Sequence, residues 1–146
     1  MLAKISKFLT TLNTPEINDE EKISLETACT VLLCEVMRAD GNLDEKEQAL
    51  LETIVAQRFS IPAEEARSLI SEGITLSEHA TDFYQFTSVL NKHYLDEEKT
   101  QIVTLLWQLA RVDGNVARIE EHIIKRIADL LHLRHADYIR AKEQSI

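Results

Sequence analysis

The chain contains the stretch RADGNLDEKE at residues 38–47 and a second version of it, RVDGNVARIE, at residues 111–120. In each copy an Asp-Gly-Asn triplet begins two residues after an arginine, and a glutamate lies seven residues after the aspartate. The apolar positions that follow also match, since Leu50, Leu51 and Ile54 correspond to Ile123, Ile124 and Ile127. A repeat of this kind indicates a duplicated supersecondary unit. We therefore expect two pseudo-symmetric helix pairs, each with an Asp-Gly-Asn corner between its helices.

Helical spacing of apolar residues extends over the remainder of the 146-residue chain, which has only 3 Gly and 2 Pro. This pattern predicts a single all-α domain of about seven to eight helices over residues 1–146. We expect helices at 2–12, 19–39, 43–58, 60–73, from Thr81 or Asp82 onward, 96–112, 116–131 and 136–143. The domain then divides into an N-terminal amphipathic helix (1–14), a first repeat (19–60), connecting helices (61–94) and a second repeat (96–133).

The composition of the chain disfavours several classes of function. The chain has 25 acidic and 16 basic residues, a net charge of −9, and this disfavours nucleic acid as a partner. The glycine clusters of nucleotide-binding loops are missing from the sequence. It has no apolar run long enough for a transmembrane segment, and its first residues do not resemble a secretory signal. Cys29 and Cys34 point about 140° apart on one helix, so we expect reduced thiols and a cytoplasmic location.

Each repeat resembles the second half of an EF-hand loop, in which an acidic residue precedes a glycine and a glutamate closes the loop. The earlier ligand positions hold residues such as Arg38 and Arg111, so one copy offers only half a site. Two facing copies could pool four carboxylates as metal ligands, namely Asp40, Glu47, Asp113 and Glu120. A divalent cation, calcium first, would then remove the repulsion between them.

The same residues have a second interpretation. The glycine ends one helix in a left-handed conformation and Asn42 or Asn115 caps the next, while Arg38 and Arg111 neutralise the carboxylates. This interpretation explains Gly and Asn but does not by itself explain the recurrent glutamate.

Residues 38–47 and 111–120 resemble the motifs of the TerB-like family, named for tellurite-resistance proteins, and the resemblance covers roughly residues 20–135. It implies an all-helical fold of two pseudo-symmetric halves, with an acidic cluster thought to chelate a metal. Related domains occur in membrane-anchored DnaJ-like co-chaperones and beside tellurite-resistance membrane proteins. The implied role is a stress-response or scaffold module rather than an enzyme. The second copy differs from the first in having Ala117 and Arg118 in place of Asp44 and Glu45.

Other residues have simpler explanations. The spacing of His132 and His135, with His122 ahead of them, could suit zinc, but a helix end is expected there. Cys34 has no base near it in sequence, so we expect a core thiol rather than a nucleophile.

The aromatic residues Trp107, Tyr84, Phe86 and Tyr94 are expected in the core. The first helix, with Lys4 and Lys7, could contact an anionic membrane, although packing on the domain itself is favoured.

Together these patterns predict a non-enzymatic cytoplasmic module that binds a divalent cation and a protein partner, which could belong to a membrane-associated complex. The alternative is a metal-free interaction module with an acidic surface. A two-metal hydrolase is a third hypothesis, but no general base or nucleophile is visible for it.

Overall fold

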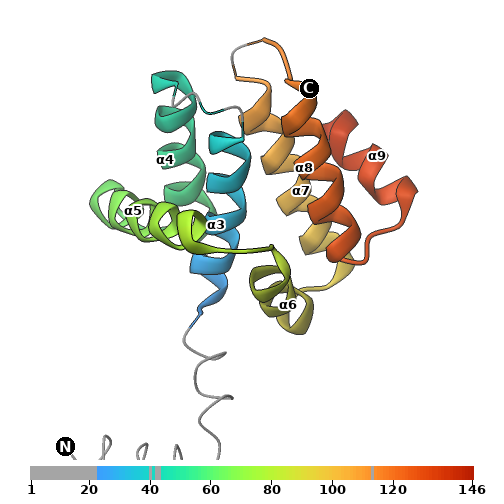
Figure 1. The fold of residues 1–146 in the computed structure, drawn as a ribbon, viewed down its shortest axis with the longest axis horizontal. Coiled ribbons are helices and arrows are strands. Elements are labelled where there is room, and N and C mark those ends of the chain that lie inside the picture. The colour runs from blue at the N-terminus through green and yellow to red at the C-terminus, as the bar shows by residue number, and fades with distance from the viewer. Residues whose placement is uncertain (1–22, 40, 42–43, 113) are drawn as a thin grey trace, which may run out of the picture.

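The structure, a computed structural model, describes residues 23–39, 41, 44–112 and 114–146. Within these ranges the chain forms seven α-helices and no strand, which confirms the all-α prediction (Figure 1). They are α3 (Leu25–Arg38), α4 (Glu45–Phe59), α5 (Ala63–His79), α6 (Tyr84–His93), α7 (Asp96–Ala110), α8 (Arg118–Leu130) and α9 (His135–Gln144). The expected helix at 2–12 lies outside the described residues.

Helices α3 and α7 form the centre of the domain. Every residue of α3 from Thr27 to Cys34 is buried, and α7 contributes the large buried side chain of Trp107. The two helices contact each other, and the most extensive contacts of the domain are those of α5 with α3 and of α9 with α7. In Figure 1, α5 accordingly crosses one side of α3, and α9 covers the far side of α7. The pseudo-twofold relation between the halves stays a prediction.

The position of Gly73 shows how closely α5 approaches α3. A Cβ atom at Gly73 would lie 3.1 Å from Thr30 Cγ2 and 3.3 Å from Cys34 Sγ, which is tighter than ordinary van der Waals contact. The glycine thus permits the close helix crossing. The expectation that this helix ends near Gly73 is wrong, because α5 continues to His79.

The first described helix also begins later than expected. The sequence suggested a helix from a cap at Asp19, but Ser24 has extended backbone and is the N-cap of α3. The Ser24 Oγ accepts a hydrogen bond of 3.0 Å from the backbone N–H of Thr27. A serine at this position satisfies one of the backbone donors that a helix start leaves open.

Most of the aromatic residues that were expected in the core are found there. Trp107 and Phe86 are buried, and Tyr94 packs against the core while partly exposed. Tyr84 is an exception, because 65% of its surface is exposed at the start of α6. Its burial was therefore predicted wrongly.

Candidate functional site

The two Asp-Gly-Asn corners contain the backbone conformation that the sequence predicted. Gly41 has φ of +80° and Gly114 has φ of +93°, both in the left-handed region. Residues other than glycine rarely adopt this backbone conformation, so both turns depend on glycine. Asp40 and Asp113, two of the four proposed ligands, lie outside the described residues.

Both corners lie at the same end of the helix bundle. In Figure 1 the C-terminal ends of α3 and α7 are at the top of the view, and α4 and α8 begin there. Helix α3 also contacts α8, and α4 contacts α7. The first turns of α4 and α8, which are far apart in the sequence, thus lie at the same end of the domain.

The helices after the corners are not capped by the asparagines that were expected to cap them. Helix α4 has Asp44 at its N-cap, whose Oδ1 accepts a 2.7 Å hydrogen bond from the backbone N–H of Lys46. Helix α8 has Ala117 at its N-cap, which has no such side chain. The predicted cap role of Asn42 and Asn115 is wrong because each helix begins three residues after its asparagine.

Glu120 supplies the missing cap of α8 from inside the helix. It is the third residue of α8, and its Oε1 accepts a 2.9 Å hydrogen bond from the backbone N–H of Ala117. This is the glutamate half of a capping box. Glu47 has the same place in the first turn of α4. Capping therefore accounts for the glutamate of the second copy, whereas in the first copy the side chain of Asp44 caps the helix.

Both glutamates are nevertheless unusual in their burial. Glu47 is 2% exposed and Glu120 is 3% exposed, whereas Glu45 and Glu121 beside them are exposed. Burying a carboxylate is costly unless hydrogen bonds or a cation compensate for lost hydration. The two remaining proposed ligands, Glu47 and Glu120, are thus carboxylates held inside the domain at the end where the corners lie.

Arg38, at the end of α3, takes part in a hydrogen-bonded chain that joins α3 to α5. Its Nη1 donates to Ser77 Oγ at 2.7 Å, and the Ser77 hydroxyl donates to Glu35 Oε1 at 2.5 Å. Ser77 is buried near the end of α5. This serine was missed in the sequence analysis because α5 was expected to end before it.

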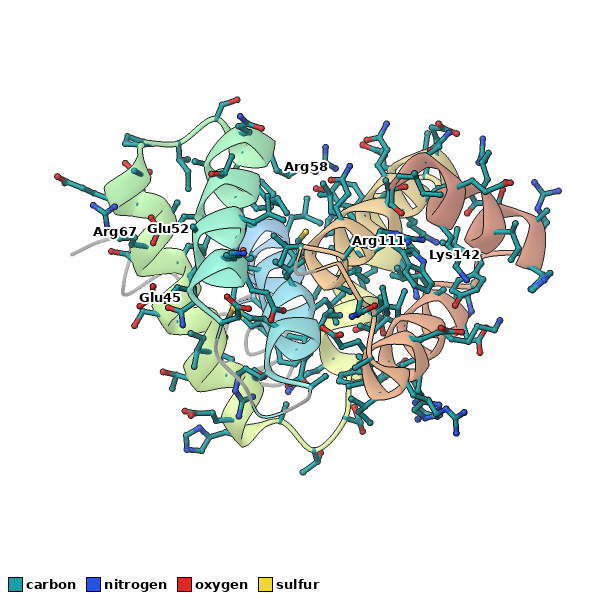
Figure 2. All side chains as sticks on the ribbon, turned by 90° about the horizontal axis from the view of Figure 1, so that it is seen from above. Glu45, Glu52, Arg58, Arg67, Arg111 and Lys142 are labelled. Atoms are coloured by element: carbon teal, nitrogen blue, oxygen red, sulfur yellow. The ribbon has the colours of Figure 1, made fainter. Side chains whose placement is uncertain are left out.

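Arg111 makes the corresponding contact in the second half. Its Nε donates to Ser145 Oγ at 2.9 Å, just after α9. Its guanidinium carbon lies 5.4 Å from the centre of the Trp107 ring, and Lys142 Nζ lies 4.9 Å from the same ring. Figure 2 shows Arg111 and Lys142 reaching into the same region between α7 and α9. The described hydrogen bonds of both repeat arginines therefore go to serines. The predicted pairing with Asp40 and Asp113 concerns residues outside the described ranges.

The alternative chemistries do not gain support. Within residues 23–39, 41, 44–112 and 114–146, no three His, Cys, Asp or Glu side chains are grouped so that they could hold a metal ion. His132 has a positive φ of 61° and follows the C-cap of α8, Leu131, so it lies at a helix end as expected. His135 was expected there too, but it is the first residue of α9.

Cys29 and Cys34 are free and buried, as predicted. Burial raises the pKa of each thiol to about 12, so neither is a nucleophile at neutral pH.

A last feature of the fold concerns membranes. None of the helices in the described part of the chain is both long and apolar enough to cross a bilayer.

Comparison with known proteins identifies the family. The family model described as tellurite resistance protein TerB matches residues 26–143, which includes every described helix except the outermost residues of α3 and α9. Searches of curated proteins and of solved structures gave no match. Because the family model covers most of the 146 residues, this chain belongs to the TerB family.

Proposed function

We propose that the protein is a non-enzymatic helical module that binds one divalent cation, calcium first, at the end of the bundle where the two corners lie. The ligands are Asp40, Glu47, Asp113 and Glu120. The cation braces the two halves, and its binding controls the docking of a protein partner.

One observation carries this proposal: the first turns of α4 and α8 each hold a buried glutamate at the same end of the domain. Carboxylate oxygens are the ligands that calcium prefers, and a bound cation offsets the cost of burying them. The hydrogen bond from Ala117 to Glu120 engages one oxygen of a group that can accept at about four sites. Capping and metal ligation are therefore compatible at Glu120.

Membership in the TerB family supports a role in the response to tellurite or a related stress. The net charge of −9 supports a partner with a basic surface. Membership in the family supports a membrane-associated complex in the cytoplasm as that partner. These statements rest on analogy at the level of the family, and no reaction is assigned to the protein.

The second candidate is a metal-free interaction module. The hydrogen bond from Ala117 to Glu120 favours it, because helix capping then accounts for the glutamate of the second repeat without a metal. Under this alternative the acidic surface docks a basic partner directly.

Thermal unfolding of the metal-stripped full chain separates the two candidates. It is followed in EDTA and then with calcium, magnesium or zinc. A cation at 100 times its dissociation constant stabilises the folded state by about 2.7 kcal/mol if it binds that state alone. For a domain of this size we expect a rise in Tm of roughly 5–10 °C.

Glu120→Gln is the most informative variant, because glutamine keeps the cap to Ala117 but removes the charge. We expect it to retain most of its stability in EDTA and to lose most of the calcium shift, as should Asp40→Asn with Asp113→Asn. The matched control is Glu121→Gln, which changes the adjacent exposed glutamate and should keep the shift. If no ion shifts the Tm of the parent chain, the metal proposal fails and the metal-free alternative stands.

A further inference from the structure

A groove at the start of α3 and along α5 is distinct from the corners. It has a volume of about 510 Å³, and its walls carry the four glutamates Glu26, Glu64, Glu65 and Glu72. Among the described residues that line it there is no Lys, Arg or His. The groove is therefore a strongly negative surface even for this acidic chain.

The groove also has an apolar floor. Ile61 and Leu69 line it and pack against the hydrophobic core while remaining partly exposed. One wall is a single stripe of α5, because Glu65, Leu69 and Glu72 follow the spacing of one helix face. Such a surface suits an amphipathic segment with apolar residues on one side and positive charges at its edge.

The chain itself contains a segment of this composition. Residues 1–12 have Lys4 and Lys7 and no Asp or Glu, with Leu2, Ile5, Phe8, Leu9 and Leu12 at helical spacing. The segment is complementary to the groove in both charge and hydrophobicity. The sequence predicts that this segment is amphipathic, but it does not indicate where the segment docks.

The point at which this segment joins the domain favours the same groove. Ser24, which lines the groove, is the second residue of the first described range. From Glu64 to Glu72 the groove wall extends over nine helical residues, about 12 Å. Residues 13–22 form a connection of ten residues that can extend to about 33–36 Å. The segment can therefore reach the whole groove without leaving its own molecule.

We propose that residues 1–12 dock in this groove of the same molecule, with Lys4 and Lys7 facing its glutamates and the apolar residues on Ile61 and Leu69. The proposal does not depend on the metal site.

Disulfide trapping in the full chain tests the proposal. Ser6→Cys is combined with Ser68→Cys, an exposed position that lines the groove. The matched control combines Ser6→Cys with Gln101→Cys, an exposed position on α7 outside the groove. Cys29 and Cys34 stay unreactive because both are buried and burial raises their pKa to about 12. In dilute solution we expect the groove pair to form an intramolecular disulfide about tenfold faster than the control pair.

Charge exchange tests the electrostatic part. Glu64→Lys with Glu65→Lys should slow trapping to the control rate, and adding Lys4→Glu and Lys7→Glu should restore it. Because acidic residues in the first turn of α5 also stabilise the helix, Glu72→Lys provides a second variant outside that turn. Unfolding curves of each variant confirm that it is folded.

Three results would overturn the proposal. Equal trapping rates at the two positions would show that the segment does not prefer the groove. Disulfide-linked dimers would place the segment of a second copy there. Binding of the full chain to vesicles containing anionic lipid, lost when residues 1–12 are deleted and accompanied by no intramolecular trapping, would make the segment a membrane anchor.

Discussion

Gly73→Ala is the substitution that most directly tests the packing of α5 against α3. Two effects of opposite sign compete at this position. Alanine is favoured over glycine in a helix interior by about 0.8–1.0 kcal/mol. The new methyl group, however, would lie 3.1 Å from Thr30 Cγ2 and 3.3 Å from Cys34 Sγ, and both neighbours are buried.

The geometry decides which effect is larger. Thr30 is β-branched and has little rotameric freedom on a helix, so it cannot easily move away. Overpacking of a well-filled core costs about 1–3 kcal/mol. We therefore expect Gly73→Ala to reduce the free energy of unfolding by about 1 kcal/mol, which lowers the Tm by about 3 °C.

A double-mutant cycle with Thr30→Ser makes the assay specific. Serine removes the methyl group that the new Cβ would meet, so in this background Gly73→Ala should be neutral or stabilising. The coupling energy from denaturant unfolding should be at least about 1 kcal/mol. Ser71→Ala, at an exposed position of α5, serves as the control for helix propensity alone.

If Gly73→Ala stabilises the protein by the full propensity difference and its coupling to Thr30→Ser is zero, the close approach of the two helices is refuted. Intermediate stabilities with clear coupling would support it.

Three further predictions follow from the described contacts. Arg38→Ala removes the hydrogen bond to Ser77 and should cost about 1–2 kcal/mol in chemical unfolding, since bonds to charged groups are among the stronger ones; full stability would contradict the bond. The hydrogen bond from Arg134 lowers the pKa of Asp137 in the folded protein. The ionised Asp137 therefore stabilises the fold at any pH above the pKa that this group has in the unfolded chain. The stabilisation is lost as the pH falls through the lower pKa of the folded state. Melting curves of Asp137→Asn and the parent chain should thus differ at pH 7 and converge in acid. The two buried thiols, whose pKa values are about 12, should not react with a thiol reagent at pH 8 until the protein is unfolded.

Much of the fold is predictable because its signals are local. Helical spacing of apolar residues and scarcity of Gly and Pro indicate an all-α chain, and α4 and α9 begin and end within two residues of their expected bounds. The left-handed glycines of the two corners are likewise local, since only a few residues determine such a turn. Motif spacing within residues 38–47 and 111–120 was also sufficient for the family assignment.

The errors occurred where a distant segment determines what a residue does. Gly73 has the sequence character of a helix end, yet it lies inside α5 because α3 packs against it. Tyr84 has the character of a core residue, yet 65% of its surface is exposed.

For the candidate site, too, some features follow from the sequence and others only from the tertiary structure. Sequence spacing alone determined which residues the two repeats share, including Glu47 and Glu120. Only the tertiary structure brought the first turns of α4 and α8 to one end of the bundle, buried both glutamates and directed Arg38 to Ser77. The physical reason is that helix formation and turn geometry depend on neighbours along the chain, whereas burial and hydrogen-bond partners depend on which helices pack together.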